Sequence, residues 1–482
     1  MTLRPVQRAQ VVVVGSGPGG AVTACLLAEA GKDVLILEEG DFIPQESCRP
    51  FSVEEMGQKY RNGGLTVALG KTKVPYVEGC CVGGGSEINS GLYHRTPPDI
   101  LERWRREFLV EGLLEEEMLP FFEANERDLG VTLMPGPASP ASLKLHAGAT
   151  LMGWRSQEVP RWFTYDAAGV GRRNSMTKLF IPRALKAGAR LMPGTRVMNL
   201  RREGVGWRLQ ATGRNRKERI DLRADAVFVA GGAVQTPALL RRSGLAPRAG
   251  RSFSLHPTVK VAAEFSEEVN SVSAGVPVHQ VKEFAPHYSF GGSVSSLPFL
   301  SLVMADHADH LPRLGKVWRQ MAIYYCMVSG HMGGSVRPLP FFDDPLVQYA
   351  VSDADMASLA EGLKNLCLLL FAAGARMLYP SVPGLGPFGK REDLAMIPQR
   401  LPAGLANLMS LHLFSSCPMG ENLDLCVVDS FGRVHGQDGL YVADASLLCS
   451  SPGVNPQGSI MAVVRRNAME YLERDKRKIC AN

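Results

Sequence analysis

Three polar side chains near the C-terminus stand where a cofactor or a substrate could meet them. His412 lies in the apolar stretch LHLFSSCPMG, Asp444 follows a strand expected at 440–442, and Asn455 precedes a helix expected at 458–472. An imidazole with its ordinary pKa of about 6.5 can accept a proton near neutral pH. An acid at a strand end and an amide before a helix are suited to hold a cofactor. A single histidine in an apolar stretch is also typical of a core residue, so both interpretations of His412 stay open.

A glycine-rich turn near the N-terminus has the pattern of a nucleotide-binding loop. Gly15, Gly17 and Gly20 form G-x-G-x-x-G, and Glu38 lies 21 residues after Gly17. In this pattern the first glycine permits a tight turn, the second lets the backbone approach a pyrophosphate, and the third lets a helix pack closely. An acid placed like Glu38 can accept hydrogen bonds from a ribose.

The elements around this turn complete a β-α-β unit. Buried strands are expected at 11–14 and 34–37, with a helix at 21–30 between them. The N-terminus of that helix would stabilise phosphate charge. The unit therefore predicts a dinucleotide site, without separating NAD from FAD.

Two later segments also suggest close approach to the backbone. Residues 79–93 read GCCVGGGSEINSGLY, which fits either a bound group or a close chain crossing. Residues 226–245 predict a buried strand at 226–230, a turn, and a helix that begins at Thr236-Pro237, because proline is favoured at the start of helices. A strand–turn–helix unit so far from the first one indicates a sheet rebuilt from distant segments.

Composition excludes several classes of protein. The 482 residues are 45% hydrophobic and 21% charged, which excludes wholesale disorder, and the scattered net charge of +6 gives no support to nucleic-acid binding. No apolar run is long enough to predict a transmembrane segment. A strand begins almost at once, so no cleaved signal peptide is expected, and the ten cysteines then indicate a reducing, cytoplasmic location.

Four blocks of sequence, taken together, resemble the glucose–methanol–choline (GMC) flavoprotein oxidoreductases nearly end to end. The N-terminal GSGPGG…VLILEEG is similar to their FAD fingerprint, and residues 79–93 resemble the first signature, with Cys80 as a departure. Residues 232–245 resemble the second signature. The blocks at 412–420 and 428–446 resemble the C-terminal motifs, with serines at 415 and 416 in place of glycine and threonine.

The resemblance implies an α/β fold in which a Rossmann-like FAD-binding domain of GMC type is joined to a substrate domain with a large antiparallel sheet and flanking helices. It implies noncovalent FAD, because Ile88 stands where some members carry a flavin-linked histidine. The expected domains are FAD-binding parts at 1–100, 170–257 and 410–482, a lid and substrate-domain segment at 101–169, and a substrate-binding domain at 258–409.

The resemblance also assigns the site residues. Gly15, Gly17 and Gly20 would hold the pyrophosphate, Glu38 the adenosine ribose, and the backbone of Val197 the adenine. Further cofactor contacts would come from Gly84, Gly85, Asn89, Asp444, Ala445 and Asn455. His412 and Asn455 match the catalytic His/Asn pair of the family.

The implied reaction is oxidation of an alcohol: His412 takes the hydroxyl proton while hydride passes to flavin N5. The apolar stretches favour a hydrophobic alcohol, with bacterial long-chain or sterol alcohol oxidoreductases as the nearest likeness. The electron acceptor stays open between oxygen, a quinone and a cytochrome. A lyase, a light-driven fatty-acid decarboxylase and a flavin-holding partner protein are the alternatives, because a fold does not fix its chemistry.

The region at 258–409 has no sharp motif. Strand-like runs are expected at 259–265, 299–304, 321–329 and 347–351, with a helix at 354–374 capped by Asp353. The segment Asp306 to His310 is interpreted as a solvated loop, and no metal site is expected.

Overall fold

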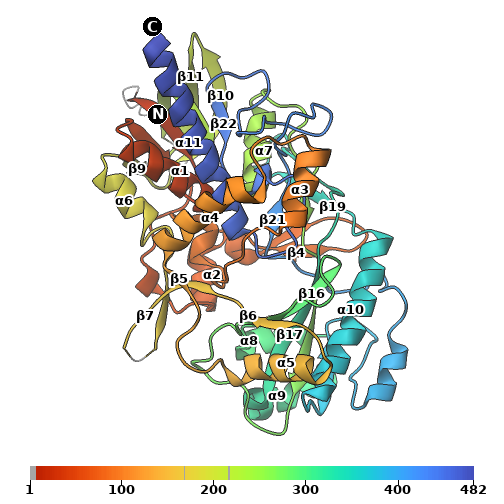
Figure 1. Cartoon of the computed structure of the whole chain (residues 1–482). Coiled ribbons are helices and arrows are strands. Elements are labelled where there is room, and N and C mark those ends of the chain that lie inside the picture. The colour runs from red at the N-terminus through yellow and green to blue at the C-terminus, as the bar shows by residue number, and fades with distance from the viewer. Residues whose placement is uncertain (1–6, 168, 215–217, 482) are drawn as a thin grey trace.

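The computed structural model describes residues 7–167, 169–214 and 218–481. Residues 1–6, which bear on the expectation of no signal peptide, lie outside the described part. Two sheets organise the molecule, one in each half of the view in Figure 1. No helix within the described residues is long and apolar enough to cross a membrane.

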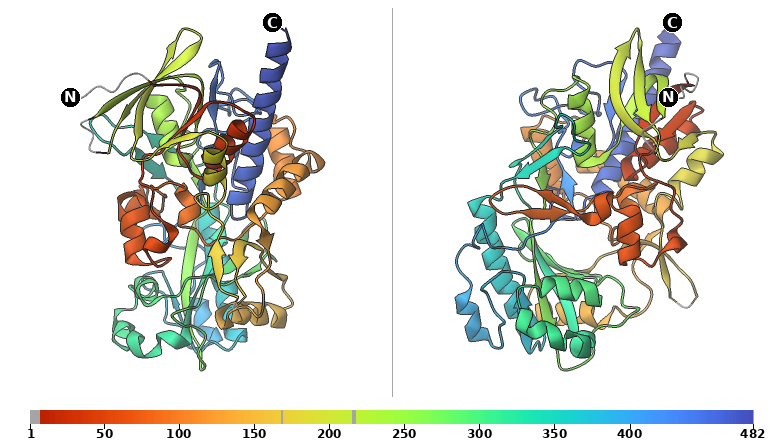
Figure 2. Two further views of the ribbon diagram at one scale, coloured as in Figure 1. Left: turned by 90° about the vertical axis from the view of Figure 1, so that its left-hand side faces the viewer. Right: turned by 180° about the vertical axis from the view of Figure 1, so that it is seen from behind.

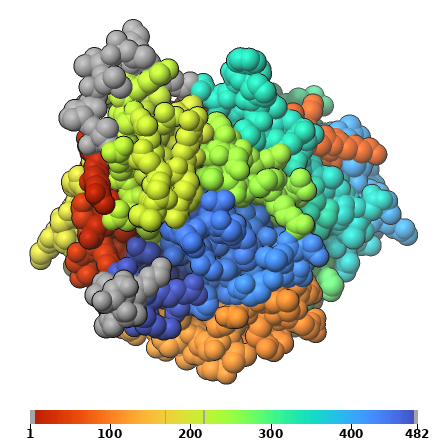
Figure 3. Space-filling view, turned by 90° about the horizontal axis from the view of Figure 1, so that it is seen from above, coloured from red at the N-terminus to blue at the C-terminus, as the bar shows by residue number. Residues whose placement is uncertain are grey.

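The first sheet is assembled from three separate stretches of the chain. Its order is β10-β11-β12-β1-β2-β9, and β22 pairs with the end of β12. Neighbours are parallel except for the antiparallel meander of β10, β11 and β12. Its strands are β1 (Gln7–Val14), β2 (Val34–Leu37), β9 (Arg190–Met192), β10 (Arg196–Glu203), β11 (Gly206–Thr212), β12 (Arg219–Val229) and β22 (Leu440–Val442). Figure 3 shows these stretches meeting on one face of the molecule.

Helix α1 (Pro18–Glu29) links β1 to β2 and packs against two other helices, α6 (Phe180–Lys186) and α11 (Gln457–Ala481). The second half of β1, Val11 to Val14, and the whole of β2 are continuous apolar runs, as expected for a parallel sheet covered on both faces. The sequence therefore predicted the β-α-β unit closely, including β2 at its observed bounds.

The second sheet is antiparallel throughout, in the order β20-β14-β17-β16-β15-β6. Its strands are β6 (Ser156–Glu158), β14 (Thr258–Glu264), β15 (His279–Val281), β16 (Tyr288–Ser293), β17 (Met321–Val328) and β20 (Met377–Pro380). One face packs against α5 (Pro140–Leu151) and α10 (Asp353–Ala372), and Figure 2 shows these helices on the outer side. Side chains alternate between faces, so the other face is free to turn toward the first domain.

The other elements connect or flank the two sheets. The helices are α2 (Val53–Lys59), α3 (Pro98–Glu107), α4 (Glu115–Leu129), α7 (Gly232–Arg242), α8 (Leu297–Val303) and α9 (Leu311–Val317). The short strands are β3 (Thr66–Ala68), β4 (Val74–Tyr76), β5 (Val131–Thr132), β7 (Arg161–Tyr165), β8 (Gly171–Arg173), β13 (Ser254–Leu255), β18 (Gly334–Arg337), β19 (Leu346–Tyr349) and β21 (Leu413–Phe414).

The fold class agrees with the expectation, and three local predictions about helices are wrong. Residues 299–304 form helix α8 rather than a strand. Pro298 stands in its first turn, and Leu300 and Val303 are buried at helical spacing while Leu302 is exposed. The cap of α10 is Ser352, whose hydroxyl accepts from the backbone N–H of Asp355, and not Asp353.

Helix α7 is the third correction, because it begins at Gly232 and holds Pro237 in its interior. Proline has no N–H to give to the carbonyl four residues earlier, that of Ala233. The Ser416 hydroxyl donates to this carbonyl at 2.6 Å instead. A partner from a distant segment thus permits a proline that the local pattern placed at the helix start. The domain boundaries themselves stay a prediction.

Candidate active site

A crevice of about 500 Å³ separates the Rossmann-like sheet from the antiparallel sheet. All the residues expected to bind the cofactor or act on the substrate line it, except Gly20. The structure therefore brings together residues from both ends of the chain. Helix α1 directs its N-terminus at this crevice through Gly17 and Pro18.

The three fingerprint glycines do different jobs. A Cβ on Gly15 would lie 2.2 Å from the carbonyl oxygen of Ala230, and one on Gly20 would lie 2.1 Å from that of Gly15. These two glycines allow backbone to pack against backbone. A Cβ on Gly17 would meet only the Cα of Gly84, at 3.9 Å. The space at Gly17 is therefore open toward the crevice, as a pyrophosphate beside a helix N-terminus requires.

The buried carboxylate of Glu38 forms hydrogen bonds to the glycine-rich turn. One carboxylate oxygen accepts from the backbone N–H and the hydroxyl of Ser16 at 2.9 and 2.7 Å, and the other accepts from the N–H of Gly40 at 2.8 Å. Burial raises the pKa of Glu38 against the effect of these donors. The oxygen that accepts from Gly40 keeps a further lone pair, so the carboxylate can still accept from a ribose hydroxyl.

Asp444 accepts hydrogen bonds from the first residues of two helical segments. Its oxygens accept from the N–H of Gly232 at 2.8 Å and the Thr236 hydroxyl, at the start of α7, and from the N–H and hydroxyl of Ser446. Ala445 begins the short helical turn that Asp444 caps. Asp444 therefore shapes this part of the crevice as well as facing it.

The opposite wall comes from the first signature. Gly84 and Gly85 lie in a short helical turn, and a Cβ on Gly85 would meet nothing within 4 Å. The Asn89 amide donates to Gln457 at 2.6 Å and accepts from the N–H of Gly91 at 3.0 Å. Val197 lies on β10, the edge strand of its sheet, where backbone groups are available for an adenine. This set of open glycines, amides and an acid fits FAD.

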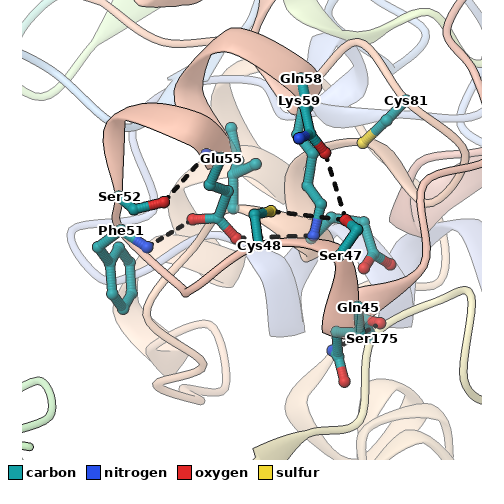
Figure 4. Close-up of polar contacts among 12 residues, drawn as sticks. Gln45, Ser47, Cys48, Phe51, Ser52, Glu55, Gln58, Lys59, Cys81 and Ser175 are labelled. Carbon is teal, nitrogen blue, oxygen red and sulfur yellow. Dashed lines mark hydrogen bonds and ion pairs between the residues drawn. The ribbon is translucent and has the colours of Figure 1, made fainter.

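A buried ion cluster supports that wall. Glu55 accepts from Arg173 at 3.1 Å and from the N–H of Phe51 at 2.6 Å, and the Lys59 ammonium lies 3.7 Å away. Figure 4 shows Glu55 between Ser52, Phe51 and Lys59. Arg173 also donates to the carbonyl of Asn89 at 2.6 Å, so the cluster fixes the loop that carries Asn89.

His412 sits in a line of hydrogen bonds at the junction of the two domains. Its Nε2 lies 3.3 Å from the Asn455 amide nitrogen, and its Nδ1 lies 2.9 Å from Nδ1 of His256. The Asn455 carbonyl oxygen accepts from Gln280 at 3.1 Å, and Nε2 of His256 lies 2.6 Å from the Ser451 hydroxyl. A line of donors thus runs from β15 to the C-terminal loop.

The direction of this line sets the tautomer of His412. Because the Asn455 amide N–H points at Nε2, that nitrogen must carry a lone pair, and the ring proton is on Nδ1. Nδ1–H then donates to Nδ1 of His256, whose own proton on Nε2 donates to Ser451. His412 is thereby held with its basic nitrogen beside Asn455, ready to accept a proton.

The surroundings keep His412 neutral. Burial, and then the charge of Lys282, lower its pKa to about 4. Burial also lowers the pKa of His256 well below its ordinary value, with His412 as the next cause. The pair is therefore uncharged at neutral pH, and a core interpretation of His412 no longer suffices, since it lines the crevice.

Sequence reasoning missed four residues of this network. His256 belongs to no motif that indicates a site, and Gln280, Tyr325 and His94 were not singled out. Gln280 donates to the Tyr325 hydroxyl at 3.2 Å as well as to Asn455. His94 is buried, and Gln280 is the hydrogen-bonding group among the causes of its pKa. The HP dipeptide was the one local signal for His256, and the others depend on tertiary contacts.

Cys417 and the segment from Asp306 to His310 carry other potential metal-ligating side chains. Cys417 is a buried thiol whose pKa is raised by burial, so it behaves as a core residue. The solvated loop expected at Asp306 to His310 is wrong for His307, which is buried and bonds the carbonyl of Pro380 at 2.9 Å. Among the described residues no group of three or more histidine, cysteine, aspartate or glutamate side chains could hold a metal ion.

A Rossmann-like sheet with a glycine-rich turn, joined to an antiparallel sheet across a crevice, defines an α/β protein of the dinucleotide-binding class. Family models described as GMC oxidoreductase match residues 56–258 and 342–463, and one described as an NAD(P)-binding Rossmann-like domain matches residues 13–43. An uncharacterized GMC-type oxidoreductase of Sinorhizobium fredii (strain NBRC 101917 / NGR234) is 38% identical over 98% of this chain and 96% of that one. The chain belongs to the GMC oxidoreductase family, and its cofactor is FAD.

More distant relatives carry functional names. A long-chain-alcohol oxidase of Arabidopsis thaliana is 26% identical over 94% of this chain and 66% of that protein. It is a plant protein, whereas the sequence suggested bacterial long-chain alcohol oxidoreductases. A solved formate oxidase from Aspergillus oryzae, described for its FAD modification, aligns with a TM-score of 0.77 at 16% identity, over 96% of this chain and 98% of that one. This second likeness concerns the fold alone.

Proposed function

We propose that the protein oxidises a hydrophobic alcohol, with His412 as the acceptor of the hydroxyl proton. The observation that carries the proposal is the directed line from Gln280 through Asn455 to Nε2 of His412, which keeps the ring proton on Nδ1 and the basic nitrogen at the crevice. An alcohol proton has a pKa far above neutral, so its removal needs a positioned base. Bound FAD supplies the acceptor for the hydride from the carbinol carbon.

Asn455 and His256, the two residues that contact the base, have different roles in the proposed reaction. When the hydroxyl takes its place beside Nε2 of His412, the Asn455 amide gives up its bond to that nitrogen and donates to the alcohol oxygen instead, which orients the hydroxyl. His256 holds the productive tautomer and shares the charge that arises when Nε2 is protonated. Neither role requires a metal ion.

The proposed cofactor contacts follow the crevice. Gly17 and the N-terminus of α1 hold the pyrophosphate, Glu38 the ribose and Val197 the adenine. Gly84, Gly85 and Asn89 flank the pyrophosphate and flavin. The cofactor is noncovalent in this proposal, since Ile88 has no group that could bond to the flavin. Denaturation with acid should release all the yellow colour from the protein.

An apolar alcohol is supported by the substrate side of the crevice. Its lining includes Val276, Phe299, Leu302, Met327, Met409 and Leu411. Such a wall binds hydrocarbon in proportion to the area removed from water. A sugar would leave its hydroxyls without partners there.

Anaerobic mixing with a panel of primary, secondary, aromatic and sterol alcohols tests the proposal. Bleaching of the bound flavin by an apolar alcohol is the expected result. Product without bleaching would indicate a lyase or a light-driven decarboxylase. No bleaching and no product from any alcohol would contradict the proposal.

A further inference from the structure

Lys260 is a cation on the substrate face of the antiparallel sheet. It lies on β14, two residues from Thr258, and pairs in register with Tyr325 on β17. Alternation along the strand puts Lys260 on the face opposite Val259 and Val261, which are fully buried against the outer helices. Lys260, Thr258 and Tyr325 all line the crevice.

The ammonium of Lys260 has no carboxylate to balance it. No hydrogen bond or ion pair joins its side-chain nitrogen to any group in the described parts of the chain. Burial alone lowers the pKa of Lys260 to about 8. The neighbouring Tyr325 stays a neutral phenol, because burial raises its pKa to about 12. A half-buried cation without a counter-ion carries part of the cost of desolvation, and a charge brought by a ligand would relieve it.

The place of Lys260 relative to the base is also defined. Its cross-strand neighbour Tyr325 contacts Gln280, which contacts Asn455, which contacts His412. Adjacent strands lie about 5 Å apart. Lys260 therefore stands across Tyr325 from the reacting centre, with the apolar side chains of Phe299 and Leu302 also on the crevice wall.

We propose that Lys260 binds a carboxylate at the far end of the substrate, so that the alcohol oxidised belongs to a hydroxy acid with an apolar chain. This inference rests on the proposed alcohol oxidation and narrows its substrate class. The hydroxyl lies beside His412, the hydrocarbon follows the apolar wall, and the carboxylate pairs with the ammonium. A second lysine, Lys282, has a different place: it does not line the crevice, and its ammonium lies 3.5 Å from the Ser289 hydroxyl.

Matched substrates test this assignment on the FAD-loaded enzyme. The pair is ω-hydroxydodecanoate and dodecanol, compared in the wild type, Lys260→Met, Lys260→Arg and Lys316→Met. Lys316 is an exposed lysine on α9 of the same domain, so its variant controls for a change in net charge. Loss of a charged contact predicts a fall in kcat/KM for the hydroxy acid of about 10- to 100-fold in Lys260→Met. Dodecanol turnover should be unchanged there, and Lys260→Arg should restore most of the loss.

A binding measurement separates this inference from the proposed reaction. Dodecanoate has the carboxylate and no hydroxyl, so its effect on the flavin spectrum reports binding without turnover. The expected result is tight binding in the wild type and Lys316→Met, weakened at least about tenfold in Lys260→Met. Equal losses for both substrates, or equal dodecanoate binding in all variants, would overturn the role of Lys260. Failure of both alcohols to bleach the flavin, with dodecanoate binding still dependent on Lys260, would overturn the proposed oxidation alone.

Discussion

His256 and His412 face each other through their Nδ1 atoms, 2.9 Å apart, at the ends of the paired strands β13 and β21. Two neutral imidazoles in this arrangement share one proton, so the tautomer of one ring decides that of the other. The Asn455 amide donates to His412, and His256 donates to Ser451. These two end contacts fix the direction in which the hydrogen bond between the two rings runs. The strength of His412 as a base therefore depends on a residue outside the crevice.

Replacing His256 should slow flavin reduction without loss of FAD. In His256→Phe the acceptor for Nδ1–H of His412 is gone, and we expect a decrease of roughly 10- to 100-fold, as for other partners that orient a histidine. His256→Asn places an oxygen near the lost Nδ1 and should recover part of the rate. Stopped-flow bleaching under argon measures both, and equal rates in the two variants would argue against tautomer control.

The pH profile of flavin reduction should extend well into acid. The base must be unprotonated, so the rate falls only as the pH drops through the pKa of His412, which is lowered to about 4. The groups facing it are His256 and His94, both kept neutral by burial, the Asn455 amide and the cation Lys282. An acidic limb near pH 6.5 in the wild type would contradict this account.

Lys282→Met should move that limb upward. Removing the positive charge takes away the second cause of the lowered pKa and leaves burial, so the limb should rise and still lie below pH 6.5. Lys316→Met, on the outside of α9, should leave the limb in place. A limb that does not move in Lys282→Met would exclude this charge as a determinant.

The fingerprint glycines should separate cofactor binding from folding. Gly17→Ala adds a methyl group into open space, so the chain should fold and lose FAD affinity. Gly20→Ala puts a Cβ 2.1 Å from a backbone oxygen and should destabilise the fold by about 1–3 kcal/mol or more. Flavin content and urea unfolding of the two proteins give the comparison. Full FAD content in Gly17→Ala would refute its role at the pyrophosphate.

Removing the charge of Glu55 should lower the stability of the protein more than removing that of Glu54, its neighbour on the same helix. Glu55→Gln leaves Arg173 and Lys59 without their anion, and breaking a buried pair costs about 3–5 kcal/mol. Glu54→Gln, at an exposed position of α2, is the matched control and should change stability little. Thermal unfolding of the two variants measures the difference, and equal melting temperatures would show that the cluster contributes nothing.

The sequence predicted what depends on short-range pattern. The β-α-β unit, β22 and the sheet assembled from distant segments follow from apolar runs, turn glycines and family motifs. Helix α8 was missed because a short apolar run fits either a strand or a helix. Pro237 led to a wrong prediction of where α7 begins. The residue that satisfies the carbonyl left free by this proline, Ser416, comes from another part of the chain.

The network behind the active site was beyond the sequence for a similar reason. His256, Gln280 and His94 are far apart in the chain and belong to no motif that indicates a site. Their roles appear only when β15, the joint before β14 and the C-terminal loop meet at His412. Lys260 looked like an ordinary strand residue, since strand alternation does not show whether a cation will find a counter-ion.

The most direct test of the account is the anaerobic rate at which an apolar alcohol bleaches the flavin in His412→Ala. Exposed His287 provides the control, His287→Ala, and both proteins must retain FAD. Loss of a general base predicts a rate about 10²–10⁴ times lower than in the wild type, with His287→Ala unaffected. A bleaching rate in His412→Ala equal to that of the wild type would contradict the assignment of His412 as the proton acceptor.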